Sequence, residues 1–408
     1  MTKVVIIGGG AAGLMAGGYA SMYGADVTIF EKMPKVGRKI LISGKGRCNL
    51  TNYCDVQEFM RNVPVNNKFL YSALNGFTPE DIIDFFENLG LKTKVERGNR
   101  VFPVSDRAMD VVDTLRAFAL DNGCEIIHKP VSGVKAENGA VKGVIVESRL
   151  IPCDSLIIAT GGKSYPRTGS TGDGYKFAEK LGHTVTRLRP SLIPLESPDA
   201  DCKRLQGLSL RNVRLKITTA KGREVFSDFG EMLFTHFGIS GPIVLSASCN
   251  MTDYSEGYTA HIDLKPALSN EQLDARILRD FSENINRAVS NSLSKLLPKK
   301  LIPVVLDRWQ ADSAKKCNSV TKEERRALLE ILKNFTVQIS APRPIDEAIV
   351  TSGGVKVSEI NPKTMESKLV KGLYFAGEVI DVDAYTGGFN LTIAWATGKL
   401  AGENSIYN

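Results

Sequence analysis

Lys3-Val-Val-Ile-Ile-Gly-Gly-Gly-Ala-Ala-Gly13 is the stretch of sequence that decides the fold of this chain. Its first five residues form a short apolar run rich in β-branched side chains, which is typical of a strand covered on both faces. Glycines with the spacing GxGxxG follow at once, and a helix-forming stretch continues to about Tyr23. This order of strand, glycine turn and helix predicts a parallel α/β sheet that binds a dinucleotide.

Each glycine has its own task in such a turn. Gly8 permits the tight turn, Gly10 lets the backbone approach a pyrophosphate, and Gly13 lets the helix pack against the strand. The helix N-terminus adds free N–H groups and the positive end of the helix dipole. A second strand, residues 25–30, ends at Glu31, an acid placed to bind ribose hydroxyls. The residues expected to hold the nucleotide here are Gly8, Gly10, Ala11, Ala12, Gly13, Glu31 and Lys32.

Three further segments distinguish FAD from NAD. Residues 36–52, VGRKILISGKGRCNLTN, match the pattern GRK…SGxGRCNxTN, residues 154–162 contain a strand and an ATG turn, and residues 372–398 contain GLYFAGE and GGFNL. These segments resemble a flavoprotein family that includes aminoacetone oxidases, a bile-acid reductase and an enzyme that forms dihydrouridine in ribosomal RNA. The resemblance runs from Lys3 to Gly402 and implies that the cofactor is FAD.

The same resemblance implies which residues hold the FAD. A helix that opens at the Gly387-Gly388 turn would direct its N-terminus at the flavin, where it stabilises the negative charge of the reduced ring. Lys39 and Arg47 would bind phosphate or the pyrimidine oxygens of the flavin, and Cys48 would pack beside it. The residues expected to contact FAD are Arg38, Lys39, Ser43, Gly44, Arg47, Cys48, Asn49, Val131, Thr160, Gly161, Gly377, Glu378, Gly388, Phe389, Asn390 and Leu391.

The fold class expected is α/β: a Rossmann-type FAD-binding domain of the glutathione-reductase-like superfamily with an inserted antiparallel β domain and a helical subdomain. We place the FAD-binding domain at 1–188 and 344–408 and the β insert at 189–268, where apolar residues alternate around a turn at Lys221-Gly222. The helical insert, 269–343, has an apolar face on residues 273–285 and a Thr321-x-x-Glu324 capping box.

Two local signals lie within the first segment of the FAD-binding domain. Glu137-Asn138-Gly139 between two extended runs predicts a β-hairpin. Residues 107–122 have a helical pattern, for which Ser105 is the expected N-cap.

Substrate is expected to bind where the insert and the flavin meet. The insert motif Leu233-Phe-Thr-His-Phe-Gly-Ile-Ser-Gly-Pro242 also resembles the family, and it contains His236. Imidazole titrates near neutral pH, so His236 is the candidate catalytic residue for proton transfer or substrate orientation. The alternative is that His236 only forms a hydrogen bond within a turn. Tyr385 either touches the ring or the substrate, or only packs.

The cysteines allow a rival interpretation. Disulfide reductases carry a cysteine pair after the second strand, and Cys48 and Cys54 lie there, but their spacing differs and no second nucleotide motif follows. The seven cysteines form no CxxC pair and no zinc-type spacing, so no metal site is expected. Apolar runs are too short to span a bilayer and no signal peptide is visible, which predicts a cytoplasmic protein without a membrane partner.

The net charge of +7 is concentrated in one region. Residues 271–343 contain 14 Lys and Arg against 9 Asp and Glu. One interpretation is a phosphate-binding surface for structured RNA; the other is an ordinary solvated helical face.

Three functions follow as hypotheses. The first is a reductase of a conjugated C=C bond, with uracil in ribosomal RNA as the leading candidate. Because no second GxGxxG appears, NAD(P)H would bind only transiently as the reductant. The second is a flavin oxidase or enone reductase that acts on a small molecule. The third is an FAD-binding RNA-modification or regulatory protein without redox turnover. The sequence leaves the oligomeric state open.

Overall fold

Strand β1 is the central strand of a five-stranded sheet in the computed structural model, which describes residues 1–407. All neighbouring strands of this sheet are parallel. Their order is β20 (Leu373–Phe375), β10 (Ser155–Ile158), β1 (Lys3–Ile7), β2 (Asp26–Phe30) and β6 (Glu125–Ile127). The predicted Rossmann-type α/β fold is therefore confirmed, and the carboxyl ends of these strands meet at one edge.

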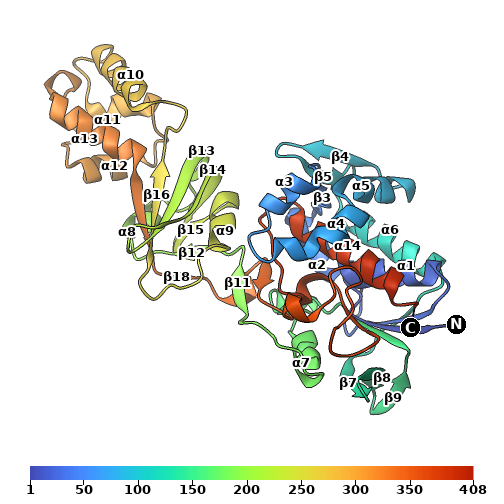
Figure 1. The fold of residues 1–408 in the computed structure, drawn as a ribbon. Coiled ribbons are helices and arrows are strands. Elements are labelled where there is room, and N and C mark those ends of the chain that lie inside the picture. Colours follow the sequence, from blue (N-terminus) through green and yellow to red (C-terminus); the bar gives the residue numbers. More distant parts are fainter. Residues whose placement is uncertain (408) are drawn as a thin grey trace. The chain divides into compact units, whose positions relative to one another are not determined.

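The first and last segments of the chain build this domain together. Helix α1 (Ala11–Met22) packs along α14 (Phe389–Asn404), and Figure 1 shows the two side by side. The approach is close, because a Cβ added to Gly398 would lie 2.5 Å from the Ala12 carbonyl oxygen. A Cβ added to Gly402 would lie 2.4 Å from the carbonyl oxygen of Ala16. Glycine therefore lets the two backbones touch.

Of the two local predictions for this domain, the β-hairpin at residues 137–139 is confirmed and the N-cap at Ser105 is not. Asn138 and Gly139 both have positive φ, 51° and 75°, and join β7 (Val131–Glu137) to β8 (Ala140–Val146) as predicted. The prediction of Ser105 as an N-cap was wrong. Helix α6 (Ala108–Asp121) has Arg107 at its N-cap without a side-chain bond, because Asp106, at φ 56°, turns the chain between Ser105 and the helix.

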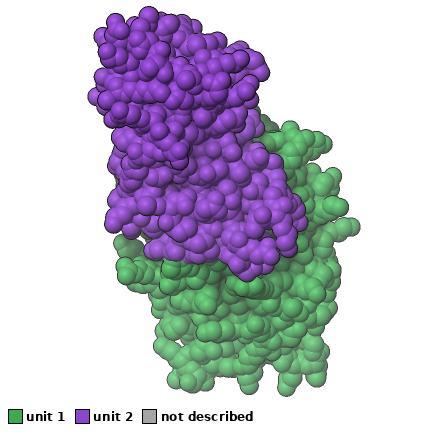
Figure 2. Space-filling model, turned by 90° about the vertical axis from the view of Figure 1, so that its left-hand side faces the viewer, with its two compact units in different colours: residues 1–191, 344–408 green, residues 192–343 purple. Residues whose placement is uncertain are grey.

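The chain divides into two compact units, which Figure 2 colours separately. Unit 1 comprises 1–191 and 344–408, and unit 2 comprises 192–343. The first division thus lies three residues beyond the position expected from the sequence.

Unit 2 is built on a seven-stranded antiparallel sheet. The turn at Lys221-Gly222 joins its two longest strands, as predicted, and Gly222 has a φ of 78°. In order, the strands are β17 (Phe335–Ile339), β16 (Tyr258–Asp263), β13 (Ser209–Thr219), β14 (Glu224–Thr235), β15 (Gly238–Ser240), β12 (Leu195–Glu196) and β18 (Ala341–Pro342).

The helical segment belongs to the same unit. Its main helices are α10 (Asn270–Ser282), α12 (Ile302–Trp309) and α13 (Lys322–Lys333), and the predicted capping box at Thr321 and Glu324 is formed. Two corrections apply. Residues 335–342 return to the sheet as β17 and β18, so Phe335 begins a strand rather than ending a helix. Leu278 and Ile285, both assigned to the apolar face, are 45% and 50% exposed, and Ile285 lies beyond the end of α10.

No helix within residues 1–407 combines the length and the apolar character needed to cross a bilayer.

Candidate functional site

The residues predicted to bind the dinucleotide lie at the carboxyl edge of the parallel sheet. Gly8 follows β1, Glu31 follows β2, and Gly377 lies two residues after β20. Thr160 and Gly161 lie just beyond β10. A hydrogen bond from the Gly8 N–H to the Phe30 carbonyl (2.8 Å) joins the first two of these positions. Four segments that are far apart in sequence thus meet at one edge, which is where open α/β sheets bind ligands.

Close packing explains two of the three motif glycines. Gly8 has a φ of 107°, and a Cβ there would lie 2.5 Å from the Ala159 carbonyl oxygen. A Cβ on Gly13 would lie 1.9 Å from the carbonyl oxygen of Gly8. Gly10 differs, because an added Cβ would meet no atom within 4 Å. Open space therefore remains beside the N-terminus of α1, and no side chain within residues 1–407 caps that end. Room and free N–H groups together fit a pyrophosphate.

The carboxylate of Glu31 is held in a fixed orientation. Its Oε2 accepts a hydrogen bond from the Gly9 N–H and its Oε1 accepts one from the Met33 N–H, each at 2.8 Å. A carboxylate offers about four lone-pair positions, so it can still accept ribose hydroxyls. Lys32 is less available, because its Nζ donates to the Asp173 carboxylate at 2.6 Å and to the Thr171 hydroxyl. These contacts direct Lys32 to the start of α7 (Asp173–Lys180).

The loop at residues 43–49 has an unusual backbone. Gly44, Lys45 and Cys48 all have left-handed φ values, 55°, 60° and 59°. A Cβ at Gly44 would lie 2.9 Å from the Asn49 backbone nitrogen, so the loop tolerates only glycine there. The Asn49 side-chain Oδ1 is buried and lacks a hydrogen-bond partner among the described atoms. A buried acceptor without a partner is costly, which fits a donor supplied by a cofactor.

The third flavin segment, residues 372–398, contacts the strand that follows this loop. Gly388, at φ 105°, precedes α14, and a Cβ there would lie 2.4 Å from the Thr51 carbonyl oxygen. The Asn52 side-chain amide donates to the Gly387 carbonyl oxygen at 3.1 Å. No described side chain caps α14, so its N–H groups are available, as the helix-dipole argument requires.

The structure gives other partners to some predicted cofactor contacts. The Asn390 side chain accepts from the Ala384 N–H and donates to the Ala384 carbonyl oxygen, so it holds its own loop. Phe389 is buried and packs edge-on against Phe59, with ring centroids 5.1 Å apart. Ser43 donates its hydroxyl to the Ile40 carbonyl oxygen. Arg38 begins α2 (Arg38–Ile42), Val131 begins β7, and Leu391 lies in the first turn of α14.

Lys39, which was expected to bind phosphate or the pyrimidine oxygens of the flavin, is paired with an acid. Its Nζ lies 2.7 Å from Oε2 of Glu378 and also donates to the Ser164 hydroxyl at 2.8 Å. The Thr351 N–H donates to Oε1 of Glu378 at 2.8 Å. Sequence reasoning named Lys39 and Glu378 but missed Ser164 and Thr351, because no local pattern links positions so far apart in the chain.

Arg47 also lies in an ion-pair network. Its guanidinium contacts the carboxylates of Glu96 and Asp106 and stacks over the Phe102 ring, 4.1 Å from the centroid. The hydrogen bond from Arg47 lowers the pKa of Glu96, and bonds from Lys94 and Arg47 lower the pKa of Asp106. These two acids give Arg47 a structural role that the sequence did not indicate.

Burial decides the reactivity of the thiols after the second strand. All seven cysteines are free, and Cys48 is completely buried. Burial raises the pKa of Cys48 to about 12 and that of Cys54 to about 11. Thiolates are the reactive form, so both side chains are poor nucleophiles at neutral pH.

Two histidines stand in contrasting positions. His236 lies in unit 2, exposed in the turn between β14 and β15, with its ring edge-on to Phe237 at 5.0 Å. The neighbouring Thr235 hydroxyl is buried and without a hydrogen-bond partner within the described chain. His183 lies in unit 1, buried, with Nε2 2.8 Å from the Ser367 hydroxyl. Burial lowers the pKa of His183.

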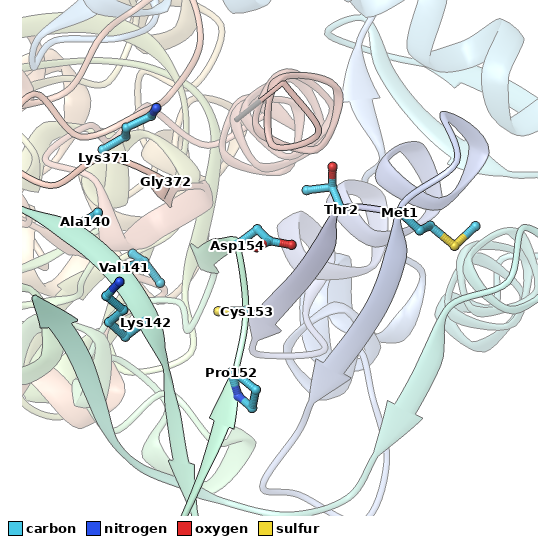
Figure 3. Close-up of a pocket in the computed structure, with 10 residues that line it drawn as sticks. All are labelled: Met1, Thr2, Ala140, Val141, Lys142, Pro152, Cys153, Asp154, Lys371 and Gly372. Carbon is cyan, nitrogen blue, oxygen red and sulfur yellow. The ribbon is translucent and has the colours of Figure 1, made fainter.

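A surface hollow lies at the opposite edge of the parallel sheet, where β1 begins (Figure 3). There the Asp154 carboxylate accepts a hydrogen bond from the Lys3 N–H at 2.8 Å. Its lining has no glycine-rich turn and no uncapped helix end, so it lacks the features that fit a dinucleotide at the carboxyl edge. The lining residues are Met1, Thr2, Ala140, Val141, Lys142, Pro152, Cys153, Asp154, Lys371 and Gly372.

Known proteins share both the sequence and the fold. A 3-dehydro-bile acid delta(4,6)-reductase of Clostridium scindens is 32% identical over 414 residues, which cover 99% of this chain and 98% of that protein. A ribosomal RNA dihydrouridine synthase of Haemophilus influenzae is 34% identical over 397 residues, which cover 96% of each protein.

Among solved structures, a 3-ketosteroid-delta4-(5alpha)-dehydrogenase of Rhodococcus jostii superposes with a TM-score of 0.54. It is 15% identical, and the superposition covers 100% of this chain and 97% of that one, so the likeness concerns the fold. Residues 2–404 match the family described as HI0933-like protein Rossmann domain. Together with the dinucleotide site at the sheet edge, this match shows that the chain belongs to the HI0933-like family of FAD-binding Rossmann proteins and is an FAD-dependent oxidoreductase.

Proposed function

We propose that this enzyme uses NADH or NADPH to reduce a conjugated carbon–carbon double bond, and that uracil in ribosomal RNA is its substrate. One observation carries the proposal. Two relatives that match nearly the whole chain are named for the same kind of chemistry, a delta(4,6)-reductase and a dihydrouridine synthase. Each name describes the saturation of a double bond conjugated to a carbonyl group.

The described residues support this chemistry in several ways. Bound FAD supplies the hydride-transfer chemistry that no side chain can provide. The open space at Gly10 and the uncapped start of α1 would receive the pyrophosphate, and the Asn49 acceptor would meet a donor on the cofactor. The uncapped start of α14 favours negative charge beside it. These features hold and tune a cofactor rather than attack a substrate.

Saturation of the double bond also requires a proton. We propose that His236 delivers it or orients the group that does. Its exposed position in a short turn between two strands leaves the imidazole accessible, and imidazole exchanges protons near neutral pH.

The proposed electron donor binds transiently. The sequence has one GxGxxG and no second nucleotide-binding unit of that kind, so a nicotinamide would approach the cofactor and leave before the substrate enters. This order predicts that reduction of the enzyme and reduction of the substrate are separable steps.

The positive charge of residues 271–343 supports the proposed RNA partner, but many of the basic side chains there are paired with carboxylates. Of the 14 basic side chains in 271–343, at least seven form ion pairs within unit 2: Arg276, Lys295, Arg308, Lys315, Arg325, Lys333 and Arg343. The remaining exposed cations still favour a polyanion over a neutral substrate.

A second candidate function is the reduction or oxidation of a small molecule. The Clostridium scindens relative, named for a bile acid, favours it. In that case the enzyme would act on a free enone, or oxygen would reoxidise the flavin with a small amine as the reductant.

The deciding experiment follows the flavin spectrum without oxygen. Addition of NADH or NADPH should bleach the flavin within seconds, and the reduced enzyme should persist until an acceptor is added. Ribosomal RNA from cells that lack the protein should then lack one dihydrouridine, and the intact gene should restore it. His236→Asn should leave the bleaching unchanged and lower dihydrouridine formation. Failure of both nicotinamides to bleach the flavin would overturn the reductase proposal, and rapid oxygen uptake with an amine would establish the oxidase.

A further inference from the structure

The antiparallel sheet of unit 2 has one buried and one exposed face. In β13, Val213, Leu215 and Ile217 are buried, whereas Arg214 and Lys216 between them are exposed. This alternation is the ordinary period of a strand with one face in the core.

Cross-strand pairing shows what surrounds the two cations. Phe229 of β14 lies opposite Arg214, and Ser227 lies opposite Lys216. On the other side, His261 of β16 lies opposite Lys216. We call the surface formed by Arg214, Lys216, Ser227, Phe229 and His261 the outer face.

The two faces have different neighbours. Helix α9 (Pro242–Ser248) packs on β14 from the inner side, where a Cβ on Gly230 would lie 3.3 Å from the Ile243 Cβ. Gly230 pairs with Val213, a buried position. Phe229, the residue before Gly230, points to the outer face and is 46% exposed. A phenylalanine exposed to this extent in the middle of a long strand does not contribute its full area to a core.

The cations on the outer face are also available. Asp263 lies opposite Arg214 across the strands, but its carboxylate binds Lys333 at 2.5 Å and accepts from the Lys265 N–H at 2.8 Å. Within residues 1–407, no carboxylate lies within 4 Å of the charged groups of Arg214 or Lys216. Residues 271–343 of the same unit differ, because at least seven of their 14 basic side chains are paired.

The outer face therefore combines an exposed ring with two unpaired cations about 7 Å apart, twice the rise per strand residue. Bases of an unpaired strand stack on exposed aromatic rings, and the phosphates beside them attract Arg and Lys. A protein interface would need more apolar surface around Phe229 than serine, histidine and two cations provide.

We infer that the outer face is a docking platform for an unpaired segment of RNA, with Phe229 as the stacking residue and Arg214 and Lys216 as the phosphate contacts. The inference rests on the proposed RNA substrate and deepens it. Net charge alone had indicated residues 271–343 as the RNA-binding surface, whereas the outer face lies on the antiparallel sheet of the same unit.

The test measures binding of a fluorescent single-stranded RNA to the FAD-loaded, full-length enzyme at several salt concentrations. Phe229→Ala should weaken binding roughly 5- to 100-fold, the range for loss of one stacked base. Phe229→Trp, which keeps an aromatic ring at this position, should bind the RNA about as tightly as the unaltered enzyme does. Arg214→Gln with Lys216→Gln should reduce the salt slope by about 1.4, two phosphate contacts at 0.7 each. The matched control, Lys322→Gln with Arg326→Gln on α13, removes the same charge elsewhere and should change the slope by less than half as much.

The outcomes separate this inference from the proposed function. If the unaltered enzyme binds no RNA, the RNA substrate itself is refuted. If it binds RNA and the outer-face variants bind equally well, the platform alone is overturned, and the face is left to a protein partner. FAD content and melting temperature of each variant show that it is folded, and the exposed Phe229→Trp variant must bind even if Phe229→Ala is unstable.

Discussion

In unit 1, backbone atoms lie so close to the expected binding residues Gly8 and Gly13 that no side chain fits at these positions. In unit 2, side chains on an open sheet face form the expected binding surface. A Cβ on Gly13 would lie 1.9 Å from a carbonyl oxygen, whereas Phe229 is 46% exposed. The first kind of site requires glycine, because any larger side chain would overlap the neighbouring backbone atoms. The second depends on residues that are present, and it tolerates substitution without loss of the fold.

The largest expected effect of a single change is therefore in unit 1. Gly13→Ala should prevent the packing of α1 on the turn, because its Cβ would overlap the Gly8 carbonyl oxygen. The cost should be on the order of 3 kcal/mol or more, the upper range for one substitution. Purified protein should contain little FAD and melt at least several degrees lower.

Gly76→Ala is the matched control for that change. Gly76 has open space around its Cβ position and no positive φ, so alanine should leave FAD content and melting temperature unchanged. Equal behaviour of the two variants would contradict the close approach seen at Gly13.

Gly10→Ala sharpens the comparison, because it lies in the same turn but in open space. Its backbone, at φ −86°, accepts alanine, and no protein atom lies within 4 Å of the added Cβ. The apoprotein should melt as the unaltered protein does, while FAD affinity should fall about tenfold or more, or 1.4 kcal/mol. Titration of apoprotein with FAD measures this. Unchanged affinity would show that the open space is not where the pyrophosphate approaches.

The sequence correctly predicted those structural features that depend only on residues close together in the chain. The turn at Gly8–Gly13, the hairpin at Asn138-Gly139 and the capping box at Thr321 each depend on residues within a few positions of one another. The alternation of apolar residues around Lys221-Gly222 also predicted an antiparallel β domain.

The parts that the sequence did not predict depend on distant residues. Lys39 meets Glu378, 339 positions away, and so does not stand free for a phosphate. Arg47 meets Glu96 and Asp106 for the same reason. Phe335 continued a helical apolar pattern, yet pairing with β16 made it the start of a strand. Tertiary partners decide such cases, and spacing along the chain does not reveal them.

A smaller effect is expected from the cysteines after the second strand. Cys54→Ser should change the rate of flavin reduction by NADPH less than twofold, because the raised pKa of about 11 leaves about one thiolate in a thousand at pH 8. In the folded protein, iodoacetamide should leave the buried Cys48 unmodified, whereas unfolding in guanidinium should expose all seven thiols. A large loss of this rate in Cys54→Ser would instead support the rival interpretation, in which Cys48 and Cys54 form a redox-active pair.

The smallest expected effect concerns the buried histidine of unit 1, and a half-buried histidine on the outer face of unit 2 provides the comparison. Burial favours neutral His183 and lowers its pKa in the fold, although Glu359, 3.3 Å away, opposes this. Below the unfolded value of about 6.5, the unfolded chain binds more protons than the folded one, so stability falls as the pH drops through that range. His183→Asn should remove this part of the slope and reduce the drop in melting temperature between pH 7.5 and 5.5 by on the order of 2 °C. His261→Asn in unit 2, where the ring contacts Thr218 and Asn334, is the control that measures how much the loss of a half-buried histidine changes the slope by itself. An unchanged slope in His183→Asn would mean that Glu359 compensates the burial in full, and the stability of unit 1 would then not depend on the protonation of this histidine.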